Sequence, residues 1–140
     1  MSTATSLATA VVFLWAGMVL GISFLEAPLK FRAPGVTVQI GLGIGRLVFR
    51  ALNMCEVVFA ALLVAVVVGG SHPPRVAVSV AVAVVVLAAQ LIVVRPLLTR
   101  RSDRVLAGEA VPRSTAHYWY LGLEVAKLLA LLGAGTLILT

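Results

Sequence analysis

The chain has 140 residues, of which 61% are hydrophobic and only 11% are charged, whereas soluble domains carry about 25% charged residues. This composition, with a mean hydropathy of +1.13, excludes an ordinary soluble domain and predicts an all-α integral membrane protein. The net charge of +6 does not indicate nucleic-acid binding, because the basic residues flank the apolar stretches, as they do in membrane proteins.

Four stretches are apolar over about 20 residues, the length of a helix that crosses a bilayer. They cover residues 7–27, 47–68, 76–94 and 116–139. We therefore expect one domain of four transmembrane helices spanning residues 1–140. Most Lys and Arg residues flank the first and third connections. The positive-inside rule then predicts that these connections are cytoplasmic and that both termini lie outside.

The first span contains Gly17 and Gly21, four residues apart, which form a small-residue face against which another helix can pack closely. Near its end, Glu26 and Lys30 have the spacing of an ion pair at the membrane interface. Pro28 is expected to end the regular helix, because proline lacks the backbone N–H that an α-helix needs.

The connection over residues 33–45 has no charged residue. We expect it to be irregular and to lie in the interface or fold back toward the bundle. Its glycines precede Arg46, which suggests a phosphate-binding loop, but the strand and lysine of a nucleotide-binding loop are missing. A lipid phosphate held by Arg46 and Arg50 is the better interpretation, and the expected partners are anionic membrane lipids.

The second span carries Asn53 and Glu56 where only apolar residues are expected. Glu56 lies ten residues after Arg46, or about 15 Å along a helix, which places it near the middle of the membrane. Because Arg46, Arg50, Asn53 and Glu56 follow one another at helical spacing, we expect one polar side of this helix to face protein or water.

The third span is apolar apart from Ser79 and Gln90, and a basic, polar connection follows it. The fourth span begins with an aromatic cluster, residues 117–120, which is typical of the membrane interface. It also repeats the polar stripe of the second span, because His117, Tyr120, Glu124 and Lys127 follow one another at helical spacing.

The two halves of the chain match at an offset of 68 residues. Pro28 then falls on Pro96 and Glu56 on Glu124. This match predicts the parallel duplication of a helical hairpin, with repeats at 1–68 and 69–136 and a pseudo-twofold axis along the membrane normal. Such an axis would place the two glutamates at the same depth.

These patterns predict a midplane site for an ion or solute. An ionisable side chain at that depth costs about 2.5 to 3.5 kcal/mol unless it is paired, so the two carboxylates need partners. One alternative is structural: a glutamate bonds Lys127 and the other is protonated. The functional alternative is that the carboxylates hold one proton or cation between them, and a lipid or cofactor site is the third alternative. The predicted site residues are Glu56, Glu124, Asn53, Lys127 and Gln90, with Arg46 and Arg50 at a lipid headgroup and Glu26, Lys30 and His117 at the interface.

No catalytic residue, metal or cofactor is predicted. The two histidines, His72 and His117, belong near opposite faces of the membrane in this topology, so they cannot form a metal-binding cluster within one chain. No nucleophile with a recognisable base occurs in the sequence.

The motifs Trp15-x-Gly17 and Pro28-x-x-Phe31 resemble those of a group of small, four-helix bacterial membrane proteins, some of which are similar to the membrane domain of copper-resistance D proteins. This resemblance implies a four-helix bundle in the bacterial inner (cytoplasmic) membrane. It carries over no site residue, because a histidine pair on facing helices is missing.

Three functions remain open from the sequence. The first is a homo-oligomer that binds or conducts a cation, proton or small polar solute at Glu56 and Glu124. The second is a non-catalytic subunit of a larger membrane complex, or a lipid-binding partner. The third is an enzyme acting on a lipid, since Glu26 and His117 are both expected near the cytoplasmic interface.

Overall fold

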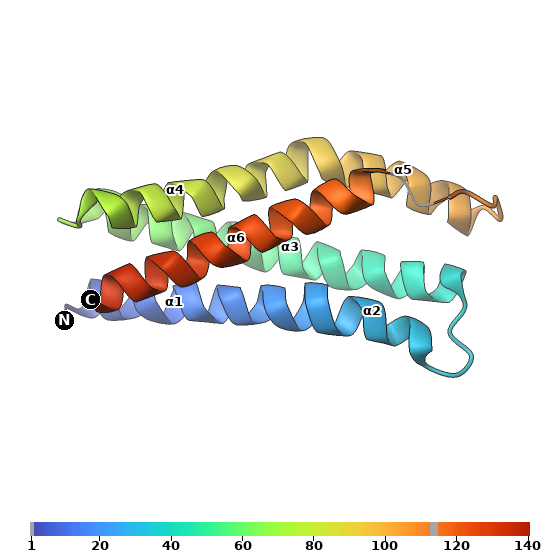
Figure 1. The fold of residues 1–140 in the computed structure, drawn as a ribbon, viewed down its shortest axis with the longest axis horizontal. Coiled ribbons are helices and arrows are strands. Elements are labelled where there is room, and N and C mark those ends of the chain that lie inside the picture. The colour runs from blue at the N-terminus through green and yellow to red at the C-terminus, as the bar shows by residue number, and fades with distance from the viewer. Residues whose placement is uncertain (1, 113–114) are drawn as a thin grey trace.

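The structure is a computed structural model that describes residues 2–112 and 115–140. In these residues the chain forms four helical spans and no strand, which confirms the all-α prediction. The spans cover Thr3–Arg32, Val38–Gly69, Pro74–Leu106 and Thr115–Leu139, and each is long and apolar enough to cross a membrane. They run alternately up and down in one bundle, with both termini at the same end (Figure 1). The protein is therefore a multi-pass membrane protein.

The first span is a helix whose hydrogen-bonding pattern changes before Pro28. It consists of α1 (Thr3–Val19), the π-helix η1 (Leu20–Glu26), α2 (Ala27–Leu29) and the 3₁₀ turn η2 (Lys30–Arg32). Ser2 caps α1 by accepting a hydrogen bond from the backbone of Thr5. The prediction that Pro28 ends the helix was wrong. A wider π turn precedes the proline, and such turns absorb an interruption of the regular ladder.

The second span, α3 (Val38–Gly69), begins eight residues before Arg46. Thr37 caps it by accepting from the backbone of Ile40. The predicted irregular connection over 33–45 is therefore confined to residues 33–37, and the glycines after it are helical. A Cβ on Gly41 would lie 2.2 Å from the Phe31 ring, and one on Gly45 would lie 2.9 Å from the Lys30 Nζ atom. These glycines let the first span pack closely on α3, so they do not form a phosphate-binding loop.

The third span resembles the first in construction. It comprises α4 (Pro74–Ala89), the π-helix η3 (Gln90–Val94) and α5 (Arg95–Leu106). The predicted polar connection after residue 94 is therefore helical as far as Leu106, and Gly108 turns the chain with a positive φ of 95°. Both π-helices end two residues before a proline, Pro28 or Pro96. The duplication itself stays a prediction.

The fourth span, α6 (Thr115–Leu139), packs on α1 and α4 and closes the bundle. The main apolar core lies in the half that contains the two termini. We call this the terminal half. Its core is wholly apolar and is built from the buried residues Ala8, Val11, Val12, Ala16, Val19, Ala60, Leu63, Val80, Ala83, Leu87, Leu131 and Ala134, together with Trp15. We call the other half, which carries residues 33–37 and 107–112 between the helices, the basic half.

Much of the surface of the bundle is apolar. Large side chains such as Leu47, Val68 and Ile92 are exposed over more than two thirds of their area, whereas Glu56, Glu124 and Lys127 are fully buried. This distribution is the reverse of that in soluble proteins. It is the one expected when lipid surrounds the helices.

Candidate functional site

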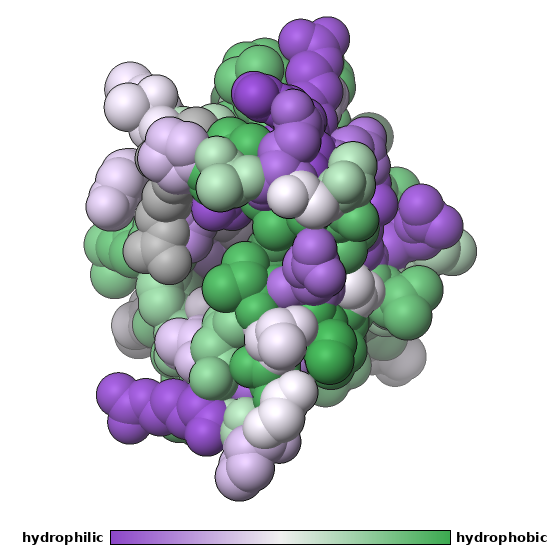
Figure 2. Space-filling view, turned by 90° about the vertical axis from the view of Figure 1, so that its right-hand side faces the viewer, coloured by the Kyte–Doolittle hydropathy of each residue, from purple (hydrophilic) through white to green (hydrophobic). Residues whose placement is uncertain are grey.

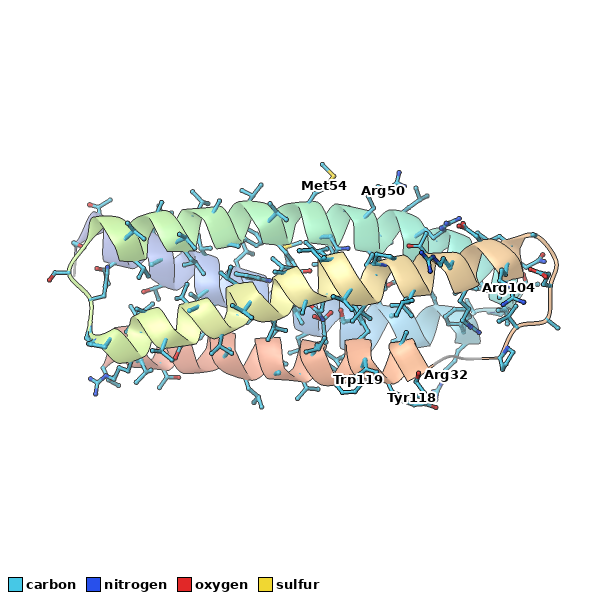
Figure 3. The ribbon with its side chains drawn as sticks, turned by 90° about the horizontal axis from the view of Figure 1, so that it is seen from above. Arg32, Arg50, Met54, Arg104, Tyr118 and Trp119 are labelled. Atoms are coloured by element: carbon cyan, nitrogen blue, oxygen red, sulfur yellow. The ribbon has the colours of Figure 1, made fainter. Side chains whose placement is uncertain are left out.

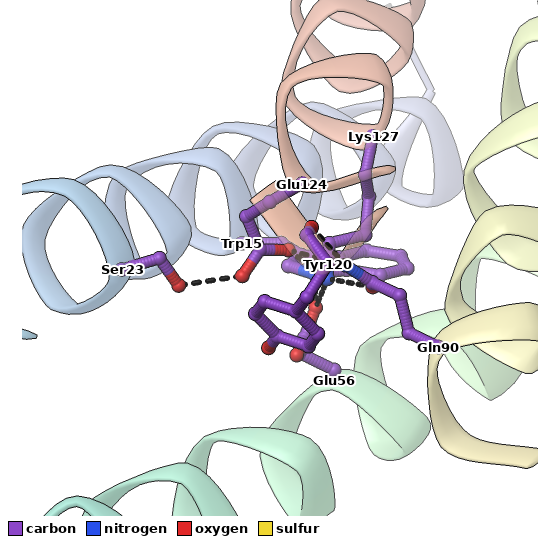
Figure 4. A network of polar contacts seen from close by, with 7 residues as sticks. All are labelled: Trp15, Ser23, Glu56, Gln90, Tyr120, Glu124 and Lys127. Atoms are coloured by element: carbon purple, nitrogen blue, oxygen red, sulfur yellow. Dashed lines mark hydrogen bonds and ion pairs between the residues drawn. The ribbon is translucent and has the colours of Figure 1, made fainter. Parts of the chain in front are cut away.

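A fully buried ion cluster lies where the four helices meet in the middle of the bundle (Figure 4). The Nζ atom of Lys127 forms ion pairs with Glu56 Oε2 and, at 2.6 Å, with Glu124 Oε1. Lys127 and Glu124 are three residues apart on α6, so they share a face of that helix. The two predicted carboxylates therefore meet, and the positive charge between them in the structure is a lysine of the same chain.

Gln90 completes this group from the π-helix η3. Its Oε1 atom accepts a hydrogen bond of 2.8 Å from Lys127, and its Nε2 atom donates one of 3.1 Å to Glu124 Oε1. The amide thus uses its acceptor for the ammonium and its donor for the carboxylate. This pairing fixes the orientation of Gln90 without a further charge.

The first span supplies two donors that the sequence interpretation missed. Trp15 Nε1 donates to Glu56 Oε2 at 2.8 Å, and Ser23 Oγ donates to Glu124 Oε2 at 2.5 Å. Three buried residues follow one another at intervals of four: Trp15, Val19 and Ser23. This helical spacing alone could have predicted that Ser23 lies on the same face as Trp15. Each span contributes at least one member of the cluster.

The cluster has more negative than positive charge. When Glu56, Glu124 and Lys127 are all ionised, two carboxylates face one ammonium and the sum is −1. One carboxylate oxygen, Glu56 Oε1, is buried without a hydrogen-bond partner among the described residues, and so is the hydroxyl of Tyr120. An unpartnered buried polar atom is costly. These atoms therefore mark the part of the cluster that can take up a further group.

A cavity of about 950 Å³ lies in the basic half and ends beside the cluster. Ser23 and Tyr120 line it and separate it from the glutamates. On the opposite side of the cluster, Trp15 and the apolar core fill the bundle. Among the described residues, the cavity therefore brings open space to the cluster from the basic half.

Three predicted site residues line the cavity and do not belong to the ion cluster. They are Arg46, Arg50 and Asn53. The polar side expected from Arg46 to Glu56 is only partly continuous, because Arg50 and its neighbour Met54 lie at the outer rim of the cavity and project from α3 away from the bundle (Figure 3). Arg50 precedes Glu56 by six residues. Six residues make about one and two-thirds helical turns, so the two side chains point about 120° apart. Arg46 instead pairs with Asp103 of α5.

The predicted interfacial residues lie in the basic half. Lys30 Nζ is 3.8 Å from Glu26 Oε2, as the spacing indicated, and Lys30 and His117 line the cavity. Tyr118 and Trp119 are exposed, at 63% and 68% of their areas, as expected for an aromatic belt. Tyr120 does not belong to that belt, because it is buried against Phe49.

Among the described residues, no three His, Cys, Asp or Glu side chains gather in a way that could hold a metal ion. Compared with known protein families, curated proteins and solved structures, the chain matches none. The resemblance to small, four-helix bacterial membrane proteins therefore stays a prediction from the residues that carry it.

Proposed function

We propose that this membrane protein binds and exchanges a proton at the cluster of Glu56, Glu124 and Lys127, and that this exchange accompanies the movement of an ion or small polar solute across the membrane. The observation that carries the proposal is the pair of carboxylates around one ammonium. With all three groups ionised, an uncompensated negative charge would remain in the middle of the bundle. Burying such a charge is expensive, and one bound proton would remove it.

A metal cation is a weaker candidate than a proton. Lys127 already occupies the position between the carboxylates in which a cation would be held. The approach through the cavity passes five basic side chains, namely Lys30, Arg46, Arg50, Arg95 and Arg101, and none of the described acidic residues lines that cavity. Positive charges along an entrance repel metal cations, whereas a proton can be passed between hydrogen-bonding groups.

Two groups at the inner end of the cavity support proton exchange with that side. Ser23 lines the cavity and donates to Glu124, and the hydroxyl of Tyr120 lies buried without a partner among the described residues. Both hydroxyls can donate and accept. They offer a short route from the cavity to the carboxylates, while the apolar core blocks a route through the terminal half.

Infrared spectroscopy tests proton binding directly, because a protonated carboxyl has a C=O stretching band that a carboxylate lacks. We expect the protein in lipid to show this band, to lose it as the pH rises, and to lack it after Glu56→Gln. The matched control is Glu109→Gln, since Glu109 is exposed and pairs with Arg104 in the basic half. A band that survives both Glu56→Gln and Glu124→Gln would disprove the proposal.

Transport is measured separately in proteoliposomes that contain a pH-sensitive dye. We expect proton flux from wild-type protein and the Glu109→Gln control, and little flux from Glu56→Gln or Glu124→Gln. Equal flux in all four proteins would exclude a role for the cluster. A titrating carboxyl band without any flux would leave proton binding in place and remove the transport step.

We further propose that the basic half faces the cytoplasm of a bacterial inner membrane and that the protein is a homo-oligomer. The basic connections support the orientation. In the part of the chain that the structure describes, nothing lies within 4 Å of a Cβ at Gly17 or Gly21. This small-residue face is thus open to a second copy. Cross-linking in membranes should detect an oligomer that Gly17→Leu weakens and Gly133→Leu, at another open glycine, leaves intact.

A further inference from the structure

We infer that the cavity of the basic half binds an anionic phospholipid, with the phosphate at its arginines and an acyl chain along its apolar wall. This site is distinct from the ion cluster, and the inference does not depend on proton exchange. It rests on three features: the sign of the charges in the cavity, the lack of partners for two arginines, and the opening of the cavity at the side of the bundle.

Among the described residues, every Lys, Arg, Asp or Glu side chain that lines the cavity is basic. These side chains are Lys30, Arg46, Arg50, Arg95 and Arg101. The cavity lies at the end of the molecule that carries both connections, where hydrophilic side chains gather among apolar ones (Figure 2). Such a cavity is complementary to an anion.

Among the basic residues of the cavity, Arg95 has buried donors that lack partners in the described part of the chain and that an anion would satisfy. Its Nε and Nη2 atoms are buried and have no hydrogen-bond partner among the described residues. The guanidinium lies over the rings of Phe49 and Tyr120, at 5.1 and 4.8 Å from their centroids. These ring contacts hold the planar group but satisfy none of its donors. A phosphate matches the donors of a guanidinium in number and geometry.

Arg50 lies at the outer rim of the same cavity. It forms no ion pair among the described residues and projects away from the bundle (Figure 3). Along α3 it lies six residues, or about 9 Å, from the level of Glu56. An arginine at that depth is costly on a lipid-facing surface unless it reaches a headgroup. A phospholipid seated at the rim would bring a phosphate to it.

The apolar wall and the opening distinguish a lipid from free phosphate. Most of the remaining lining is hydrophobic and includes Phe31, Phe49, Met54, Val57 and Leu98. Met54 is 67% exposed and Val57 is 50% exposed, so the cavity reaches the side of α3 that faces hydrocarbon. An acyl chain can enter there without crossing water. The volume falls within the range of known ligand pockets and suits a headgroup with part of one chain.

Native mass spectrometry of the protein from nanodiscs tests this site. In discs of equal phosphatidylglycerol and phosphatidylcholine, we expect the wild type to retain one phosphatidylglycerol. Arg95→Gln and Arg50→Gln should each lower the retained fraction by about tenfold, the loss expected for one charge-assisted contact. The control is Arg32→Gln, an exposed arginine of the same half that does not line the cavity.

Each outcome decides the matter. Loss of phosphatidylglycerol in the two cavity variants, with retention in Arg32→Gln, supports the inference. Equal retention in all variants, equal retention of phosphatidylcholine, or displacement of the lipid by inorganic phosphate overturns it. Arg50 is exposed, so Arg50→Gln gives a result even when Arg95→Gln does not fold. None of these results depends on a carboxyl band or on proton flux.

Discussion

The indole nitrogen of Trp15 donates a hydrogen bond of 2.8 Å to Glu56, 41 residues further along the chain. The oxygen that accepts this bond also contacts Lys127. The tryptophan ring itself is fully buried in the apolar core of the terminal half. One side chain therefore both closes that half against water and stabilises a carboxylate at its boundary.

Replacing Trp15 by phenylalanine should separate these two roles. Trp15→Phe keeps an aromatic ring near Phe59 but removes the donor to Glu56, so the free energy of unfolding should fall by about 1 to 3 kcal/mol. Circular dichroism during thermal unfolding in detergent measures the change. The control Trp119→Phe alters an exposed ring and should shift stability by less than about 0.5 kcal/mol. Equal effects of the two substitutions would contradict a special role for Trp15.

Removing the ammonium should be more harmful than removing all three charges. Lys127→Met leaves two carboxylates facing each other in the bundle and should cost about 3 to 5 kcal/mol. Combining it with Glu56→Gln and Glu124→Gln removes the unpaired charges and should restore a large part of that loss. Unfolding of the single and triple variants in the same detergent measures the difference. If the triple variant is the less stable of the two, the cluster is not held together by charge balance.

The glycines at the start of α3 should respond in opposite directions. Gly41→Ala places a methyl group where the Phe31 ring lies and should lower the stability, because that ring must move. Gly43→Ala meets nothing within 4 Å and should raise the stability by about 0.5 to 1 kcal/mol, since alanine favours helix over glycine. Thermal unfolding of the matched pair checks both signs. Destabilisation by Gly43→Ala would show that this glycine has a contact outside the chain.

The difference between the two halves of the bundle should be visible as access to water. After the single cysteine is replaced (Cys55→Ala), a new cysteine at Asn53, in the cavity, should react with a membrane-impermeant thiol reagent. A cysteine at Leu63, in the apolar core, should not react. Labelling of inside-out and right-side-out vesicles also reports which side the cavity faces. Reaction of Leu63→Cys from either side would mean that the terminal half is not closed.

The sequence was sufficient to predict the fold and most residues of the cluster. Hydropathy and length define the four spans, because a helix is the structure that satisfies an isolated apolar backbone in lipid. Ionisable or amide side chains rarely occur deep in such spans. The sequence therefore shows four conspicuous residues: Glu56, Gln90, Glu124 and Lys127. Only the structure shows that the other three side chains all contact Lys127.

Trp15 and Ser23 could not be predicted as members of the cluster from composition. Trp15 counts as a hydrophobic residue and Ser23 is a small residue of a kind common in transmembrane helices, so neither interrupts the apolar pattern. The sequence did not predict that α3 begins as early as Val38, and the reason is different. Its glycines indicate a loop when considered alone, and only the packing of Phe31 and Lys30 against Gly41 and Gly45 explains why helix is favoured there.

The π-helix η3 determines which face of the third span is polar. In an α-helix, residues five apart point in different directions, whereas i→i+5 bonding stacks them one above the other. The backbone N–H of Arg95 donates to the carbonyl of Gln90 across this wide turn. The amide of Gln90 and the guanidinium of Arg95 are thereby aligned on the same side of the helix. A single extra residue in one turn thus allows the third span to reach both the buried ion cluster and the arginine-lined cavity.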